Sequence, residues 1–296
     1  MPLEPIPRMM ARAQEGQYAV GYFESWNLES LQGVIDAAEQ TRSPVIIGFN
    51  GEFLSHAERR VEERLALYGQ LGREAAQSAK VPCGFIFNEC PDDSQIRAAV
   101  TKGFNLVMPS DPGVPYESLS SWVKDIAAFA HARDVAVESE LGVLPWGIGE
   151  VDNKHGTSTD PTLAARFVRE TGVDLLAVSV GNVHVMLGGR AELDLERLSA
   201  INEQVVVPLV LHGGSGIADE SLSAALALGI AKVNYGTYLK QRYLDAVRKA
   251  LSTDCENPHE LIGMGGENDI LVAGRVAVMQ AVIERLPTLK CAGRAE

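Results

Sequence analysis

The apolar residues of this chain fall into short runs typical of buried strands, and the stretches between the runs have apolar residues at helical spacing. Eight strands that alternate with helices along one chain predict an α/β fold, a single (β/α)8 barrel. The runs are Ala19–Phe23, Val45–Phe49, Gly84–Phe87, Asn105–Met108, Val135–Val137, Asp174–Val180, Pro208–Leu211 and Ala231–Val233.

The connecting stretches support this interpretation. Residues 28–38 place apolar side chains three and four positions apart, and Gly172 and Gly229 stand where a helix should end before the next strand. No low-complexity linker divides the chain. We therefore expect one catalytic barrel domain over residues 1–296, with a C-terminal helical extension after Asn257.

Polar residues gather where the predicted strands end, which is where such barrels carry their catalytic groups. A packed core does not explain so many polar side chains at one end, so the pattern predicts an enzyme. The longest irregular stretch, residues 144–160, follows the fifth strand, and loops of that length are more often functional than idle. The strand-end residues are Glu24, Ser25, Asn50, Asn88, Glu89, Asp111, Glu138, Glu140, Asn182, His184, His212 and Asn234.

Two of the strand ends are rich in glycine. The segment 208–217 runs from a strand into His-Gly-Gly-Ser-Gly, and the next strand ends in Asn-Tyr-Gly-Thr, residues 234–237, before a helix. Glycine turns allow backbone N–H groups to approach an anion closely, and helix starts favour phosphate. The two turns therefore predict a site for one phosphate group, the competing interpretation being that the glycines serve turn geometry alone.

Two histidines end adjacent predicted strands, six and seven. The imidazoles of His184 and His212 would then face one central point, and Glu89 ends the third strand across the barrel. Two histidines and a carboxylate suit Zn²⁺, and also Fe²⁺, Mn²⁺ or Co²⁺. The alternative is that each histidine is a hydrogen-bonded loop residue.

Charge and cysteine content narrow the class of partner. The 296 residues carry 39 acidic and 26 basic side chains, a net charge of −13, which argues against nucleic acid or an anionic membrane as the main partner. No signal peptide or membrane-length apolar stretch is seen. We expect a cytoplasmic protein with reduced thiols. The four cysteines, without zinc-ribbon spacing, are Cys83, Cys90, Cys255 and Cys291.

The chain resembles the class II, metal-dependent ketose-bisphosphate aldolases, which include fructose- and tagatose-bisphosphate aldolases. The resemblance extends from about Met9 to Ala295 and implies a TIM barrel that forms homodimers or homotetramers. It also implies a divalent metal, usually zinc, that polarises the carbonyl of dihydroxyacetone phosphate and stabilises its enediolate. The segments that carry it are Tyr18–Phe23, Val137–Gly142, Ala177–His184, Leu209–Ile217 and Lys232–Asn234.

The resemblance assigns roles to individual positions. His184 and His212 match two metal-binding histidines, and Glu140 matches a glutamate near the metal. Glu150 lies where the family has a mobile-loop glutamate that moves a proton. Gly236 belongs to the second glycine turn. The positions that match the phosphate-binding turns are Gly213, Gly214, Ser215, Asn234 and Thr237.

The third strand departs from the family pattern. The family has His-x-Asp-His there, whereas this chain has Ile-Phe-Asn-Glu at residues 86–89. Asn88 therefore replaces the acid/base aspartate, and Glu89 replaces the third metal histidine. An amide does not exchange a proton at neutral pH, whereas a carboxyl group does. The arginine that holds the second phosphate has one candidate, Arg275.

These observations predict a divalent-metal-dependent carbon–carbon lyase of the aldolase type, acting on a phosphorylated ketose or keto acid through a metal-stabilised enediolate. One alternative is another metal-assisted reaction on a phosphorylated sugar, an isomerisation, decarboxylation or hydrolysis with Asn88 as oxyanion donor. The other is a non-catalytic phosphosugar-binding subunit. The predicted catalytic residues are Asn88, Glu140 and Glu150, and the predicted metal ligands are His184, His212 and Glu89.

Overall fold

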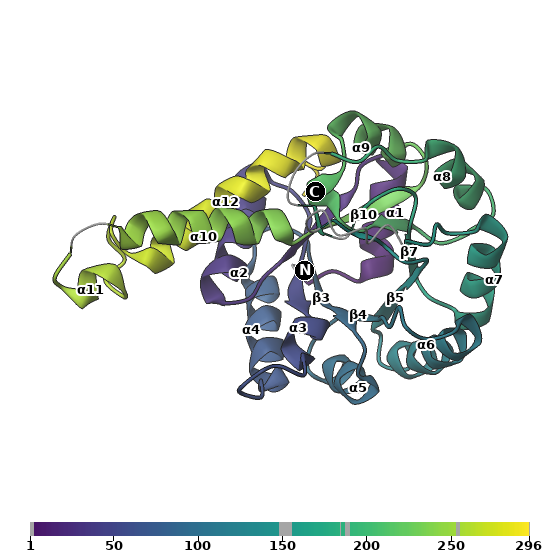
Figure 1. Cartoon of the computed structure of the whole chain (residues 1–296), viewed down its shortest axis with the longest axis horizontal. Helices are drawn as coiled ribbons and strands as arrows, with labels where there is room; N and C mark the ends of the chain where they lie inside the picture. The colour runs from purple at the N-terminus through teal and green to yellow at the C-terminus, as the bar shows by residue number, and fades with distance from the viewer. Residues whose placement is uncertain (1–2, 148–155, 184, 187–189, 253–254, 296) are drawn as a thin grey trace.

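The computed structural model describes residues 3–147, 156–183, 185–186, 190–252 and 255–295. Eight parallel strands close into a barrel in the order β1-β10-β9-β7-β5-β4-β3-β2, and helices surround it (Figure 1). The barrel strands are β1 (Val20–Glu24), β2 (Val45–Asn50), β3 (Cys83–Cys90), β4 (Leu106–Pro109), β5 (Ala136–Leu141), β7 (Leu175–Val178), β9 (Leu209–Leu211) and β10 (Ile230–Tyr235). A separate parallel pair is formed by β6 (Trp146–Gly147) and β8 (Val185–Met186).

Many of the helices begin at a side chain that caps them. Asn27 and Ser30 form a reciprocal capping box, and the carboxylates of Asp92, Asp160 and Asp194 each accept a backbone N–H of the first turn. The helices are α1 (Ile6–Glu15), α2 (Leu28–Thr41), α3 (Gly51–Ser55), α4 (Leu65–Ser78), α5 (Asp93–Thr101), α6 (Tyr116–His131), α7 (Pro161–Thr171), α8 (Leu195–Asn202), α9 (Asp219–Leu226), α10 (Thr237–Leu251), α11 (Pro258–Leu261) and α12 (Ile270–Leu289), with a 3₁₀ turn η1 (Gly214–Gly216).

The predicted (β/α)8 barrel is confirmed, and each of the eight predicted runs overlaps one barrel strand. The bounds differ most in β3 and β5, which extend three and four residues beyond the predicted ends at Phe87 and Val137. Polar residues were expected to end these strands. Instead Asn88 and Glu138 continue them, because their side chains are buried at the barrel mouth.

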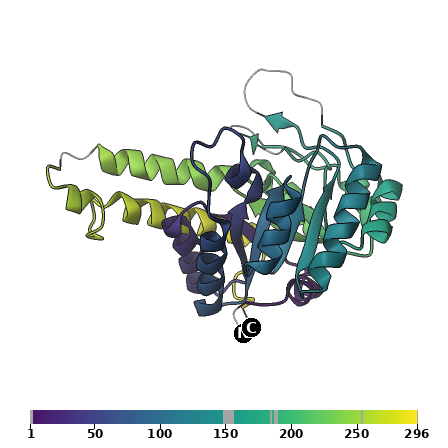
Figure 2. The ribbon, with the colours of Figure 1, turned by 90° about the horizontal axis from the view of Figure 1, so that it is seen from below.

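The C-terminal helical extension is also present. Helices α10 and α12 pack against each other and project from the barrel as a two-helix arm with α11 at its tip (Figures 1 and 2). Helix α12 also packs along α2, which anchors the arm to the barrel. None of the helices in the described ranges has the length and apolar character that crossing a membrane requires.

The barrel wall is close-packed around small residues. Gly48 in β2 lies directly opposite Ile86 in β3, and a Cβ at Gly48 would overlap the backbone oxygen of Ile86. Phe85 in β3 stacks on Phe104 with ring centroids 4.1 Å apart. The close approach of β2 and β3 fixes the two strand ends from which Asn50 and Glu89 project.

Gly48→Ala should lower the free energy of unfolding by about 1–3 kcal/mol, the usual cost of overpacking a close-packed wall. The matched control is Gly266→Ala, because a Cβ at Gly266 would have no neighbour within 4 Å. Urea denaturation of both variants measures the effect. A Gly48→Ala midpoint equal to that of the wild type would contradict the close packing of β2 against β3.

Candidate active site

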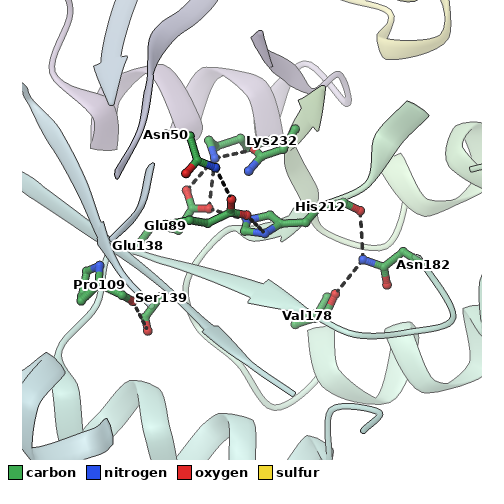
Figure 3. A network of polar contacts seen from close by, with 10 residues as sticks. Asn50, Glu89, Pro109, Glu138, Ser139, Val178, Asn182, His212 and Lys232 are labelled. Atoms are coloured by element: carbon green, nitrogen blue, oxygen red, sulfur yellow. Dashed lines mark hydrogen bonds and ion pairs between the residues drawn. The ribbon is translucent and has the colours of Figure 1, made fainter. Parts of the chain in front are cut away.

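His212, which directly follows β9, lies between two carboxylates (Figure 3). Its Nε2 is 3.1 Å from Oε1 of Glu138, and its Nδ1 is 3.0 Å from Oε1 of Glu89. Burial alone would lower the pKa of this histidine, but the carboxylates of Glu138 and Glu89 beside its two ring nitrogens raise the pKa of His212 to about 10. The two carboxylates therefore favour positive charge at this position, carried by a proton or by a metal cation.

Glu138, the carboxylate next to Nε2 of His212, also forms a buried ion pair. Lys232 in β10 and Glu138 in β5 are both 0% exposed, and Nζ of Lys232 lies 2.8 Å from Oε2 of Glu138. Burial raises the pKa of Glu138, but Lys232 and His212 together lower it below its ordinary value. Glu138 is therefore an anion that fixes both cations.

The same lysine orients Asn234. Nζ of Lys232 donates to Oδ1 of Asn234 at 2.6 Å, so the amide must turn its Nδ2 the other way. Asn234 lines the cavity above His212 and is 7% exposed, and its Nδ2 has no hydrogen-bond partner within the described part of the chain. The cavity therefore contains a pre-oriented donor for an acceptor oxygen of a ligand.

Glu89 is held by the end of β2. Oδ1 of Asn50 accepts the N–H of Phe53 at 3.1 Å and caps α3, which leaves Nδ2 of Asn50 to donate to Oε2 of Glu89 at 2.7 Å. The backbone of Glu89 has a φ of 49°, in the left-handed region, where β3 shifts register against β4. Such strain is stored at functional sites when surrounding contacts enforce it. Here it directs the carboxylate toward His212.

The two glycine turns meet at the cavity that His212 and Glu89 line. Gly214 lies behind the lining, where a Cβ would come within 2.6 Å of Val233, and Gly213 has a φ of 68° that permits the sharp turn into η1. The turn residues that line the cavity are Gly213, Ser215, Asn234, Gly236 and Thr237.

Sequence reasoning missed Lys240, which lies in the first turn of α10 and lines this cavity. Its Nζ is 2.6 Å from Oε1 of Glu24, at the end of β1, and 4.1 Å from the ring centroid of Phe53. The sequence did contain a signal for Lys240. A helical residue four positions after Gly236 lies on the same side of the helix, next to the glycine turn. Glu24 lies so close to Gly236 that a Cβ at this position would overlap its Oε2.

Besides Nδ2 of Asn234 and Nδ1 of His212, three further buried polar atoms near the cavity lack a hydrogen-bond partner among the described residues: Oδ1 of Asn88, the hydroxyl of Tyr22 and Oε1 of Glu140. Asn88 and Tyr22 line the cavity, and Glu140 lines the cleft beside it. Burial is the main reason that the pKa of Glu140 rises to about 7. The nearby His212 lowers this pKa, whereas Glu89 and Glu138 raise it. Buried polar atoms without partners call for an explanation, and a polar ligand supplies one.

Three sequence candidates remain to be located. His184 and Glu150 lie outside the described residues. Arg275, the candidate for binding a second phosphate, is paired with a carboxylate on a neighbouring helix. Its Nε and Nη2 bind the carboxylate of Asp36 at 2.6 and 2.8 Å, so Arg275 joins α12 to α2.

The residues present fit a divalent cation. His212 shares its Nε2 proton with the carboxylate of Glu138, which is the usual outer partner of a metal-binding histidine. Its Nδ1 makes no hydrogen bond of good geometry, although Oε1 of Glu89 is 3.0 Å away. Within the described ranges, no group of three or more His, Cys, Asp or Glu is arranged to hold a metal ion, and His184, the third predicted ligand, lies outside those ranges.

The profile of the family described as "Fructose-bisphosphate aldolase class-II" matches residues 4–294. The chain belongs to this family. It is similar to the YdjI aldolase from Escherichia coli K12, with 32% identity and a TM-score of 0.83 over 99% of this chain and 100% of that one. A putative fructose-1,6-biphosphate aldolase from Coccidioides immitis has 27% identity and a TM-score of 0.84, covering 98% of both chains. Fructose-bisphosphate aldolase from Campylobacter jejuni shares the fold, with 21% identity and a TM-score of 0.73 over 96% of this chain and 94% of that one.

The predicted resemblance is therefore confirmed, and so is the enzyme class, because the members of this family are aldolases, which are lyases. The family is generally dependent on a divalent metal. The departures at Asn88 and Glu89 accordingly belong to an aldolase-family member whose third strand carries an amide and a carboxylate at the mouth of the barrel.

Glu140→Gln should flatten the pH dependence of stability. The folded protein keeps Glu140 protonated up to about pH 7, whereas the unfolded chain releases that proton near 4.5. The folded state therefore binds more protons between these values, so this group makes stability fall with rising pH, by on the order of 3 kcal/mol in total. Glutamine mimics the neutral acid and removes this slope.

Urea denaturation of metal-depleted protein between pH 5 and pH 8 measures this slope. Glu15→Gln, at an exposed position in α1, is the control and should keep the wild-type slope. An unchanged slope in Glu140→Gln would show that Glu140 ionises normally in the folded protein.

Proposed function

We propose that this chain catalyses the reversible aldol cleavage of a phosphorylated ketose, assisted by a divalent metal ion that Glu89, His212 and His184 hold. The aldolase-type activity follows from the family. The metal, the phosphate and the roles of the residues are the proposal. The main support is that His212, with its Nε2 on Glu138 and its Nδ1 beside Glu89, lines the same cavity as the two glycine turns.

The phosphate end of the substrate would occupy the turns after β9 and β10. Backbone N–H groups at the start of α10 suit an anion, and Lys240, paired with Glu24, lines the same wall. The Nδ2 of Asn234, held in place by Lys232, would donate to an oxygen of the bound ligand. The proposed phosphate-binding residues are Gly213, Ser215, Asn234, Gly236 and Thr237, and Gly214 packs behind them.

The metal site would combine imidazole and carboxylate ligands. When bound, the ion supplies a Lewis acid that polarises the ketone of the substrate. Zn²⁺, Mn²⁺, Fe²⁺ and Co²⁺ all accept such ligands. Glu138 keeps the ring of His212 in one orientation, and Asn50 keeps the carboxylate of Glu89 directed toward it.

Cleavage needs a base at the hydroxyl of the carbon that becomes the aldehyde. Its O–H loses a proton, the neighbouring carbon–carbon bond breaks, and the electron pair passes to the ketone fragment, which later gains a proton on carbon. Glu140, with a pKa of about 7, can accept and return a proton near neutral pH, which Asn88 cannot do. Oδ1 of Asn88 would accept a hydrogen bond from a substrate hydroxyl, and Glu150 would exchange the proton on carbon.

The decisive experiment follows the exchange of the carbon-bound protons of dihydroxyacetone phosphate with deuterated water by NMR. Metal-depleted protein should be inactive, and reloading with Zn²⁺, Mn²⁺, Fe²⁺ or Co²⁺ should restore exchange. Glu89→Gln should weaken metal affinity by about 10- to 100-fold, because it removes a charged ligand.

The control for that variant is His259→Gln, at an exposed position of α11, which should bind metal and exchange protons as the wild type does. Absence of exchange with all four metals would contradict the proposed function. A single domain over residues 1–296, assembly as a homodimer or homotetramer, and a cytoplasmic location remain predictions of the sequence.

A further inference from the structure

The cleft continues beyond His212 and Glu89 into a cavity of about 250 Å³ between the ends of β3, β4 and β5. This cavity, called here the acidic cavity, lies across the barrel from the glycine turns. Its lining includes four carboxylates and, among the residues that the structure describes, no lysine, arginine or histidine. The four are Glu52, Glu89, Asp111 and Glu140.

The other side of the cleft offers little more positive charge. A cavity beside β1 and β2 is lined by two basic residues, Arg59 and Lys240. Arg59 is ion-paired with Glu63, and Lys240 with Glu24. Each cation therefore already lies against a carboxylate of the chain, and a second anionic group of a ligand would have to compete with it.

The acidic cavity also has groups suited to uncharged ligands. Carboxylates and the hydroxyl of Ser110 accept hydrogen bonds from sugar hydroxyls, and Oε1 of Glu140 is buried without a hydrogen-bond partner among the described residues. A phosphate placed in the same cavity would meet the like charges of Glu52 and Asp111, which weaken binding by roughly tenfold for each carboxylate that comes close.

We infer that the substrate carries one phosphate, held by the glycine turns, and that the end in the acidic cavity is an uncharged hydroxylated chain. The substrate is then a ketose 1-phosphate, and the second product is an aldehyde without phosphate. This inference rests on the proposed function and adds the substrate class. In the cleavage, the hydroxyl on the departing carbon loses its proton to the enzyme, and the ketone fragment gains one on carbon, so no further reactant is needed.

The test compares the binding of matched sugars by calorimetry to the metal-loaded protein at fixed ionic strength. Fructose 1-phosphate and tagatose 1-phosphate are each compared with the corresponding 1,6-bisphosphate. We expect at least one of the two monophosphates to bind ten or more times as tightly as its bisphosphate, with a smaller gap at high salt. Equal or tighter binding of the bisphosphates, or no binding of any of the four sugars at millimolar concentration, would overturn the inference.

A charge-neutralising double variant tests the cause. Glu52→Gln with Asp111→Asn removes two carboxylates of the acidic cavity and should strengthen bisphosphate binding several-fold, with a smaller effect on the monophosphates. The matched control is Glu62→Gln with Asp125→Asn, which removes the same charge at exposed positions. It should leave the ratio of monophosphate affinity to bisphosphate affinity unchanged. An identical affinity ratio in both double variants would show that the acidic cavity does not cause the preference for monophosphates.

The outcome of the binding test can be distinguished from the outcome of the proton-exchange test of the proposed function. Proton exchange of dihydroxyacetone phosphate needs no second fragment, so it reports on the proposed function alone. Exchange combined with faster condensation with glyceraldehyde 3-phosphate than with glyceraldehyde would refute the inference and leave the proposed function intact. A monophosphate preference without exchange would refute the mechanism and leave the binding inference standing.

Discussion

Four buried charges at the barrel mouth constrain the rest of the site. Glu89 and Glu138 are anions, Lys232 is a cation, and His212 between them is held in a state that favours positive charge. Buried charges are costly unless each has a partner, so the loss of one would leave the others uncompensated. The ends of β3, β5, β9 and β10 are therefore held in one arrangement by electrostatics as well as by the barrel hydrogen bonds.

One side of the cleft is lined mainly by backbone groups and the other mainly by side chains. The side formed by β9 and β10 is built from backbone, where Gly213 provides a positive φ and Gly214 allows close packing on Val233. The side formed by β2 to β5 is built from side chains, mostly carboxylates and amides. Backbone recognition depends on a few glycines, whereas side-chain recognition changes with single substitutions. A scaffold of this kind can keep its anion site while the opposite wall acquires a new preference.

The fold could be predicted because strand burial and helix spacing are local properties of the sequence. The strand ends were also predictable as the place where polar groups gather, which brought Glu89, His212 and Asn234 into consideration. The partners of these groups were not predictable in the same way. That Lys232 joins Glu138, and that Asn50 holds Glu89, depends on pairings 94 and 39 residues apart along the chain. The pairing of Arg275 with Asp36 was not predictable for the same reason, since the two residues lie 239 positions apart.

The contact between Glu24 and Gly236 couples two positions that lie at the start and near the end of the barrel. A Cβ at 236 would overlap Oε2 of Glu24, which is the far end of a flexible side chain, so a side chain at 236 would force this carboxylate to move. Because the same carboxylate accepts a hydrogen bond from Nζ of Lys240, that movement would also disturb a cation that lines the cavity. The bare backbone at 236 consequently allows one ion pair to tie the first strand of the barrel to the helix that follows the last strand.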